Sequence, residues 1–241
     1  MQRNIVITGG SRGLGLGIAK KLLPRADKMV LLDINMEALA DAVKELDPTG
    51  ENVFGIGCDV SDAKAVETAF AAIYEKIGHV DILVNNAGIT RDAMFHKMSN
   101  EQFETVMKVD AFSAFYCTRQ VVNKMREQKW GRIISMSSMA AYGHVGQCNY
   151  SMAKAALLGM TKTLSKELAN KNITVNALAP AVINTDMIKS IPEEQMRMIV
   201  ESIPMKRVGE VEEVAATVAF LASEEASYVT GQCICCDGAL G

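Results

Sequence analysis

The chain has 241 residues, of which 49% are hydrophobic and 22% are charged, and its formal net charge is −3. These values are ordinary for a globular protein, and they exclude a disordered chain, a collagen and a coiled coil. The mildly acidic total also disfavours a general nucleic-acid binder, which usually carries a net positive charge. Because α/β domains often extend to about 250 residues undivided, the length predicts a single domain over residues 1–241.

The first residues and the cysteines indicate in which cellular compartment the protein works. The chain opens MQRNIVITGG, without the apolar core of a signal peptide, and no apolar run reaches the roughly 18 residues of a membrane span. The chain has six cysteines, and neither the cysteines nor the histidines have the spacing of a zinc-finger site. We therefore expect a cytoplasmic protein with reduced thiols, no bound metal and no membrane contact.

Hydrophobic runs of two kinds alternate along the chain: short β-type runs predict strands, and longer stretches with helical spacing predict helices. In chain order we expect strand Ile5–Thr8, helix Leu14–Leu23, strand Met29–Asp33, helix Glu37–Leu46, strand Asn52–Cys58, helix Asp62–Ile77 capped by Ser61 or Asp62, strand Asp81–Asn85, a helix from Ser99 to about Lys124, strand Gly131–Ser137, helix Tyr150–Ala169, strand Ile173–Ala179, helix Glu210–Ala222 and strand Val229–Cys235. The alternation predicts an α/β fold: one Rossmann-like, doubly wound, parallel seven-stranded sheet with helices on both faces.

The stretch Pro180–Pro204 breaks this alternation. It is long, has no clear strand pattern and carries several large apolar side chains: Met187, Ile188, Ile191, Met196, Met198 and Ile199. Long segments of this sort in compact domains are often lids over a site. We therefore predict that residues 180–204 form a substrate lid.

A glycine-rich turn follows the first predicted strand and leads into the first helix. It reads Thr8-Gly9-Gly10-Ser11-Arg12-Gly13-Leu14-Gly15, with the spacing GxxxGxG. Glycines in such a turn let the backbone approach a pyrophosphate, whose charge suits a helix N-terminus. The turn therefore predicts a dinucleotide site that includes Gly9, Ser11, Arg12, Gly13, Leu14 and Gly15.

Asp33 ends the second predicted strand, where an acidic side chain can accept hydrogen bonds from both ribose hydroxyls of adenosine. Its charge would repel a 2′-phosphate, so Asp33 favours NAD(H). Arg12 favours the opposite, because a basic residue in the turn can contact a 2′-phosphate, and NADP(H) stays an alternative. After the third strand, Asp59 and Val60 are candidates to contact adenine; the alternative is a helix-capping turn with Asp62.

Polar residues follow the fourth and fifth strands and continue onto the next helix. Asn86-Ala87-Gly88 follows the fourth strand, Ser138 follows the fifth, and Tyr150 and Lys154 are four residues apart, on one face of a helix. A free tyrosine has a pKa of about 10, and an ammonium one turn away favours its phenolate. Tyr150 can then exchange a proton with a carbinol while hydride moves to or from a nicotinamide. Ser138 can bind the same substrate oxygen, and Lys154 can also hold the nicotinamide ribose.

Together these motifs resemble the short-chain dehydrogenase/reductase family over nearly the whole chain: TGGSRGLG, NNAG, the Ser138 region, Tyr150-x-x-x-Lys154 and Asn176-Ala177-Leu178-Ala179-Pro180. Within the family, the segments NNAGITRDAMFHKM, WGRIISMSS, GQCNYSMAKAALLG and ITVNALAP are most similar to 3-oxoacyl-[acyl-carrier-protein] reductases and acetoacetyl-CoA reductases. The resemblance implies an NAD(P)-dependent reduction of a 3-oxoacyl thioester to the 3-hydroxyacyl thioester.

The same resemblance implies further site residues and partners. The cofactor would be contacted by Asn86, Ala87, Gly88, Tyr150, Lys154, Pro180, Val182 and Thr185. The substrate would be contacted by Ser138, His144, Gln147, Tyr150 and Met187. Lys129 and Lys171 match basic positions at which the family docks its acyl carrier protein. The family's assembly implies a homotetramer packed through the helices that begin near Ser99 and Tyr150.

Some features depart from the family pattern. Asp110 stands where the family has a catalytic asparagine that holds a water in a proton relay, and an aspartate there adds a charge near Lys154. Ala181 replaces the usual glycine after the sixth strand, in the loop beside the nicotinamide. Asp33 is unusual for a biosynthetic reductase. These departures leave the substrate open.

The spacing between the serine and the tyrosine is another departure. Ser138 precedes Tyr150 by 12 residues, which is one fewer than usual and predicts a shortened substrate loop. Ser137 has the usual spacing, but alignment with the strand favours Ser138 as the catalytic serine.

Three functions therefore stay open. The sequence most favours a reductase of β-ketoacyl thioesters. The second is an NAD-dependent dehydrogenase of another secondary alcohol, such as a sugar acid, a polyol or a steroid, which the departures favour. The third is a non-enzymatic dinucleotide-binding sensor or scaffold, against which the intact Ser138, Tyr150 and Lys154 argue.

Overall fold

The computed structural model describes residues 2–188 and 191–241, apart from the side chain of Met187. Its centre is a seven-stranded sheet in the order β3-β2-β1-β4-β5-β6-β7, and every neighbouring pair of strands is parallel. The strands are β1 (Arg3–Thr8), β2 (Ala26–Asp33), β3 (Val53–Gly57), β4 (Ile82–Asn85), β5 (Gly131–Met136), β6 (Ile173–Pro180) and β7 (Cys233–Cys236). The predicted parallel seven-stranded sheet is confirmed.

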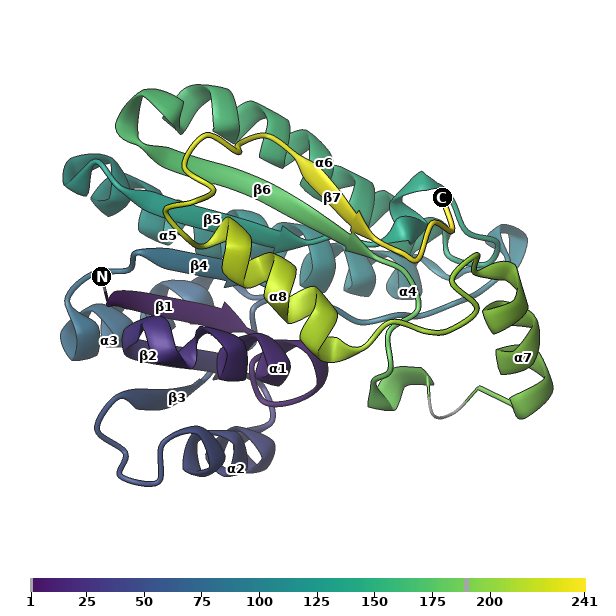
Figure 1. Ribbon diagram of the computed structural model, residues 1–241, viewed down its shortest axis with the longest axis horizontal. Coiled ribbons are helices and arrows are strands. Elements are labelled where there is room, and N and C mark those ends of the chain that lie inside the picture. Colours follow the sequence, from purple (N-terminus) through teal and green to yellow (C-terminus); the bar gives the residue numbers. More distant parts are fainter. Residues whose placement is uncertain (1, 189–190) are drawn as a thin grey trace.

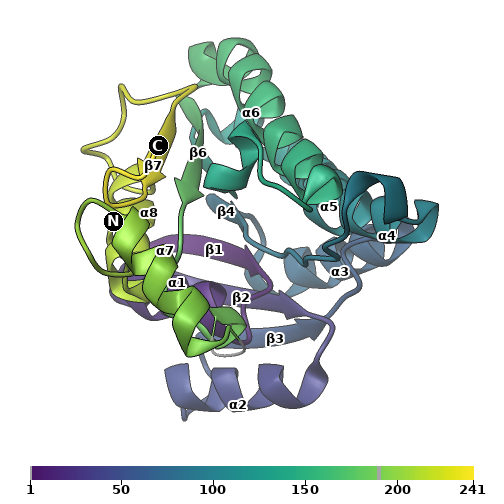
Figure 2. The ribbon, with the colours of Figure 1, turned by 90° about the vertical axis from the view of Figure 1, so that its right-hand side faces the viewer.

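Helices cover both faces of the sheet (Figures 1 and 2), which confirms the doubly wound arrangement. One face carries α1 (Gly13–Leu22), α2 (Met36–Leu46) and α8 (Val211–Leu221). The other carries α3 (Ala63–Ile77), α4 (Asn100–Val106), α5 (Ser113–Gln128) and α6 (Cys148–Leu168). Short 3-10 helices occur at Leu23–Arg25, Phe95–Lys97, Met139–Tyr142, Ala169–Lys171 and Asp186–Ile188. Within residues 2–188 and 191–241, no helix combines the length and apolar character needed to cross a bilayer.

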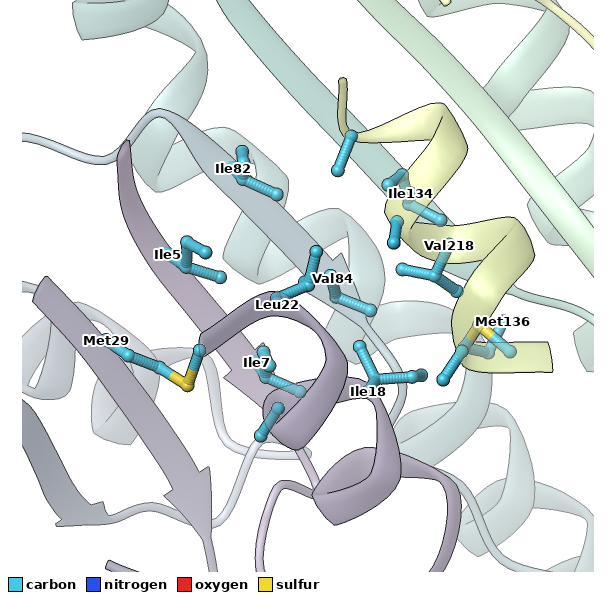
Figure 3. Packing of buried hydrophobic residues seen from close by; sticks show 14 of the residues in the cluster. Ile5, Ile7, Ile18, Leu22, Met29, Ile82, Val84, Ile134, Met136 and Val218 are labelled. Atoms are coloured by element: carbon cyan, nitrogen blue, oxygen red, sulfur yellow. The ribbon is translucent and has the colours of Figure 1, made fainter. Parts of the chain in front are cut away.

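The strands are continuous apolar runs because both faces of the sheet are covered. Figure 3 shows the layer between the sheet and helices α1 and α8, a single apolar cluster that includes Ile5 and Ile7 of β1, Ile18 of α1 and Val218 of α8, with Ile7 beside Ile18. All four side chains are fully buried, and burying each contributes roughly 1.5–3 kcal/mol of hydrophobic stabilisation. This layer fixes β1 against α1 and so positions the glycine turn that joins them.

The helix expected from Ser99 to about Lys124 starts as predicted but is not uniform. Ser99 and Gln102 form a complete capping box, each side chain accepting a hydrogen bond from the other residue's backbone N–H. α4 then passes into a π-helical segment, Met107–Phe112, before α5 begins. The apolar pattern does not distinguish a π-turn from an α-turn, because one inserted residue leaves most of the buried face unchanged.

The predicted lid segment contains a helix that the sequence pattern did not indicate. After β6 the chain forms a short bridge between Ile183 and Gly209, and α7 (Glu193–Ser202) follows. α7 lies beyond the carboxyl ends of the strands, at the same end of the molecule as α4 (Figure 1). None of its side chains is fully buried, so its apolar residues give a weaker signal than those of a core helix.

Candidate active site

The motifs singled out in the sequence meet at one edge of the sheet. The glycine turn follows β1, the Asn86-Ala87-Gly88 segment follows β4, and Ser138 lies just after β5. In the sheet β1 and β4 are neighbours, and the strand order reverses between them. Open α/β sheets bind ligands at such a switch point, outside the carboxyl ends of the strands.

The glycine turn packs tightly against the chain that follows β4. Gly9 has a φ of +61°, and a Cβ there would lie 2.9 Å from the Cα of Ala87. A Cβ on Gly15 would lie 1.9 Å from the carbonyl oxygen of Gly9. Gly13, with a φ of +54°, would direct its Cβ into open space. These glycines therefore make the turn compact on its inner side and open on the outer side.

The N-terminus of α1 suits a phosphate group. Arg12 occupies the N-cap position, is exposed, and forms no side-chain cap. The amides of the first turn, which include those of Gly13, Leu14 and Gly15, have no intrahelical acceptor, and an anion would satisfy them. The turn thus fits the pyrophosphate of a dinucleotide both sterically and electrostatically.

Hydrogen bonds between the β1 and β4 ends hold this turn in place. The Thr8 hydroxyl accepts from the backbone N–H groups of Asn86 (2.9 Å) and Ala87 (3.0 Å). The side-chain amide of Asn86 donates in return to the carbonyl oxygens of Thr8 and Gly9, both at 3.0 Å. Sequence reasoning placed Asn86 and Ala87 beside the cofactor, and it did not assign this bracing role to Thr8.

Asp33 is held beside the turn by short hydrogen bonds. Its Oδ2 accepts from the Ser11 hydroxyl at 2.6 Å and from the Ser11 amide at 3.2 Å, and its Oδ1 accepts from the Asn35 amide at 3.1 Å. Asp33 is only half-buried, so its carboxylate retains lone pairs that a ligand can approach. The expected partner of the carboxylate is a ribose hydroxyl. The Ser11 hydroxyl is a donor of the same kind and already bonds to this carboxylate.

Asp59 has a local role in its turn. Its carboxylate accepts from the amide (2.9 Å) and hydroxyl (2.7 Å) of Ser61, and Asp62 caps α3 by accepting from the amide of Lys64. Of the two expected caps, Asp62 is therefore the one observed. Val60 is buried. The observed contacts are those of the helix-capping turn that was the alternative for Asp59. Contact of Asp59 or Val60 with adenine stays a prediction.

The two serines after β5 have different surroundings. The Ser137 hydroxyl is buried and donates to the carbonyl oxygen of Lys154 at 2.9 Å. Ser138 caps the short helix Met139–Tyr142, its oxygen accepting from the Ala140 amide at 3.1 Å. Ser138 is half-buried and keeps its hydroxyl hydrogen for another acceptor, so its geometry suits a catalytic serine better than that of Ser137.

Tyr150 and Lys154 lie on one face of α6, as their spacing predicts. The Lys154 Nζ is 5.3 Å from the centre of the Tyr150 ring. The ring packs against a small apolar cluster of Val106, Ala111 and Ala153 and is half-buried. The Tyr150 ring therefore lies beside a buried ammonium and is itself partly exposed to solvent.

Lys154 is almost fully buried, and its ammonium is held by groups from two other segments. Its Nζ donates to the Met136 carbonyl oxygen at 3.0 Å and pairs with Asp110 Oδ2 at 3.0 Å. Asp110 lies in the π-helical segment and is 1% exposed, and its Oδ1 accepts from the Ile89 amide at 2.9 Å. A Cβ on Gly88 would lie 2.6 Å from Asp110 Oδ2 and 3.1 Å from Lys154 Nζ.

Burial and charge act in opposite directions on this pair. Burial alone lowers the pKa of Lys154, but the nearby Asp110 carboxylate and the Tyr150 phenol outweigh it, so the pKa of Lys154 is raised. Burial raises the pKa of Asp110 by more than Lys154 and the Ile89 amide lower it. The ammonium therefore keeps its proton at neutral pH, and Asp110 is the member of the pair that first gains a proton on acidification.

Known proteins resemble this chain over almost its full length. Residues 9–240 match the family model described as Enoyl-(Acyl carrier protein) reductase. The chain is 41% identical over 237 residues to the 3-oxoacyl-[acyl-carrier-protein] reductase FabG of Aquifex aeolicus, covering 98% of this chain and 96% of that protein. It is 39% identical over 242 residues to the reductase MabA of Mycobacterium avium (100% and 91%), and 42% identical over 241 residues to Nodulation protein G of Azospirillum brasilense (99% and 98%).

The chain belongs to the short-chain dehydrogenase/reductase family. This confirms the resemblance drawn from the motifs and makes the protein an oxidoreductase, of a family that uses NAD(P)(H).

Two loops of this short-chain dehydrogenase are joined beside the site. The amide of Ala93 donates to the Gly146 carbonyl oxygen (2.9 Å), and the Gln147 side chain donates to Asp92 (2.9 Å). The fully buried Asn149, which no pattern in the sequence indicated, donates to the carbonyl oxygens of Arg91 (2.9 Å) and Gln102 (3.2 Å). Gln147 is therefore already hydrogen-bonded between the loops.

The remaining predicted residues have the following surroundings. His144 is exposed, with Nδ1 3.1 Å from the Val145 carbonyl oxygen. Pro180 is buried at the end of β6, and the Thr185 hydroxyl lies 3.4 Å from the Ile183 carbonyl oxygen. Val182 lines a cavity of about 340 Å³ between α8 and β7 that does not include Ser138, Tyr150 or Lys154. The side chain of Met187 lies outside the described part of the chain.

Gly88→Ala should displace the buried pair of Asp110 and Lys154. The added Cβ would collide with the buried Asp110 carboxylate and crowd Lys154, so we expect turnover to fall by about 10- to 100-fold, as displacements near 1 Å do at catalytic groups. The measurement is steady-state turnover, alongside thermal unfolding to exclude loss of fold. Gly159→Ala on α6 is the matched control, because a Cβ there meets no neighbouring atom of the same chain within 4 Å. Size-exclusion chromatography checks that this variant keeps the assembly of the wild type. Equal turnover in both variants would contradict the prediction.

Proposed function

We propose that this protein reduces 3-oxoacyl thioesters, carried on acyl carrier protein or coenzyme A, to 3-hydroxyacyl thioesters. The observation that carries the proposal is the convergence of Ser138, Tyr150 and the buried Lys154 at the carboxyl edge of the sheet, beside the glycine turn. The names of two relatives, FabG of Aquifex aeolicus and MabA of Mycobacterium avium, support the same substrate class.

Each polar group has a part in this reaction. A bound reduced nicotinamide supplies the hydride. Tyr150 gives its proton to the ketone oxygen, and the Ser138 hydroxyl donates a hydrogen bond to that oxygen. The Lys154–Asp110 pair sets the electrostatic field at the phenolate that remains, since the Lys154 ammonium lies 5.3 Å from the ring centre. The surface that would hold the cofactor is formed by Gly9, Ser11, Gly13, Leu14 and Gly15 together with Asn86, Ala87 and Gly88.

Tyr150→Phe tests this assignment with acetoacetyl-CoA as substrate and both NADH and NADPH as reductants. Without the acidic hydroxyl, turnover should fall by about 10²- to 10⁴-fold, while cofactor binding, followed by fluorescence, persists. Tyr228→Phe removes the same hydroxyl from a fully exposed tyrosine and should leave turnover unchanged. Near-normal activity of Tyr150→Phe would refute the catalytic assignment.

A second candidate is a dehydrogenase that uses NAD on another secondary alcohol, such as a sugar acid, a polyol or a steroid. Asp33 favours it, because a fixed carboxylate at the adenosine ribose suits NAD better than NADP. Turnover of such alcohols with NAD, without turnover of acetoacetyl-CoA, would establish this function instead.

For either substrate we propose that the cofactor is NAD(H). Ser11 and Asn35 fix the Asp33 carboxylate, and its charge repels a 2′-phosphate, whereas Arg12, exposed at the N-cap, is the group that would accommodate NADP(H).

Asp33→Ala should therefore raise the ratio of kcat/KM with NADPH to that with NADH by at least about 10-fold, or ~1.4 kcal/mol. Asp41→Ala removes an exposed carboxylate from α2 and serves as the charge-matched control. If the ratio is the same in both variants, Asp33 does not select the cofactor.

We further propose that the protein works in the cytoplasm as a homotetramer packed through α4–α5 and α6. Its six cysteines are free, which suits a reducing compartment. Phe112, Phe115 and Met152 are about half exposed on these helices, as residues of an interface between subunits would be in an isolated chain.

We propose that acyl carrier protein docks on Lys129 and Lys171. Lys129 ends α5 just before β5, and Lys171 precedes β6, whereas the catalytic residues follow these strands. The lysines are thus separated from their own active site by roughly 20 Å of strand. A carrier bound to them would serve the site of a neighbouring subunit, which connects the carrier to the tetramer.

The double substitution Lys129→Glu, Lys171→Glu should raise KM for a 3-oxoacyl carrier-protein substrate by about 10-fold or more. The two glutamates would repel the acidic surface of the carrier, which the lysines attract. KM for acetoacetyl-CoA should not change. Lys21→Glu with Lys44→Glu makes the same change of charge on the other face of the sheet. Parallel changes in KM for both thioesters would remove these lysines from the docking surface.

A further inference from the structure

We propose that Asp110 sets the pH range in which Tyr150 transfers its proton, by cancelling the charge of Lys154. The inference rests on the proposed role of Tyr150 as the proton donor. It makes Asp110 a positioning and charge-setting residue rather than a group that touches the substrate, and it holds for a ketone of either substrate class.

The geometry makes the cancellation effective. Lys154 and Asp110 are 3% and 1% exposed, and their charged atoms are 3.0 Å apart. Water screens such a pair poorly, so its field at the neighbouring phenol depends on the sum of the two charges. The remaining contacts of the pair come from backbone groups, the Met136 carbonyl and the Ile89 amide. Neither of these groups titrates.

The sign of the effect follows from this sum. An uncharged residue at position 110 would leave one positive charge near the Tyr150 ring and so favour the phenolate. With Asp110 ionised the pair is neutral, and this support for the phenolate is largely lost. Tyr150 therefore retains its proton to higher pH than it would beside an asparagine. The protonated phenol is the form that reduces a ketone, so Asp110 extends reduction toward alkaline pH.

Other charges near the pair are too exposed to replace it. In the described residues, the titratable groups that act on Lys154 and Asp110 are each other and Tyr150. The charged or basic side chains of the neighbouring segments are all exposed to solvent: Arg91, Asp92, Glu101, Glu104, Lys108 and His144. The thiol of Cys148, at the start of α6, is half-buried. The fields of the exposed groups at the phenol are screened by water.

The first test needs neither substrate nor cofactor. The pH titration of phenolate absorbance is measured for the wild type and Asp110→Asn, each with and without Tyr150→Phe, and each pair is subtracted to isolate Tyr150. We expect the Tyr150 transition to occur about one pH unit lower in Asp110→Asn. Asp110→Ala should shift it in the same direction, since only the charge matters, and it serves if the asparagine variant does not fold. Glu104→Gln, which removes an exposed carboxylate from α4, should not move it.

The second test uses pH–rate profiles in both directions, with acetoacetyl-CoA and 3-hydroxybutyryl-CoA. In Asp110→Asn, reduction should decline at a pH about one unit lower, and oxidation should begin at a pH lower by the same amount. A residue that only supports the fold would lower the rates without moving either profile.

The outcomes separate the two proposals. If the wild type does not turn over the thioesters, the proposed function fails, and the phenolate titration still decides the role of Asp110. If the Tyr150 transition stays in place or rises in both Asp110 variants, the charge of Lys154 is lost together with that of Asp110, and the inference is overturned. A downward shift in both variants, with no shift in Glu104→Gln, supports it.

Discussion

The buried ammonium of Lys154 is the constraint on which the active site depends. An unpaired charge removed from water costs several kcal/mol, and here the compensating groups come from β5 and the π-helical segment. The Met136 carbonyl and the Asp110 carboxylate receive the ammonium, and Gly88 leaves the space in which they meet. Any shift of one of these segments leaves a buried charge uncompensated, so the segments hold one another in register.

Most of the architecture could be predicted from periodicity. Buried parallel strands are continuous apolar runs and the helices have amphipathic spacing, so the order of elements and the doubly wound sheet follow from the sequence. Ser138, Tyr150 and Lys154 could be placed together because a parallel sheet gathers the carboxyl ends of its strands at one edge. Helical spacing also fixed the common face of Tyr150 and Lys154, which the structure shows.

What could not be predicted depends on contacts between segments far apart in sequence. The π-helical segment that contains Asp110 changes the backbone hydrogen bonds but leaves the apolar pattern almost intact. Asn149 looks like any polar residue near a helix start until the carbonyl oxygens of Arg91 and Gln102 are seen beside it. α7 buries none of its side chains completely, so the feature by which sequence patterns reveal helices is weak there. Asp59 shows the converse, because a ligand-like carboxylate is also suited to bind its own turn through Ser61.

The hydrogen bonds between the two loops beside Tyr150 restrict how this part of the site can change shape. Ala93 is hydrogen-bonded to Gly146, and Asp92 to Gln147, while Asn149, at the start of α6, holds the carbonyl oxygen of Arg91. These hydrogen bonds connect the two loops into one unit. α7 lies at the same end of the molecule (Figure 1) and buries none of its side chains completely. Its sequence can therefore change at little cost to the fold, and such changes would reshape this end of the molecule while leaving Ser138, Tyr150 and Lys154 undisturbed.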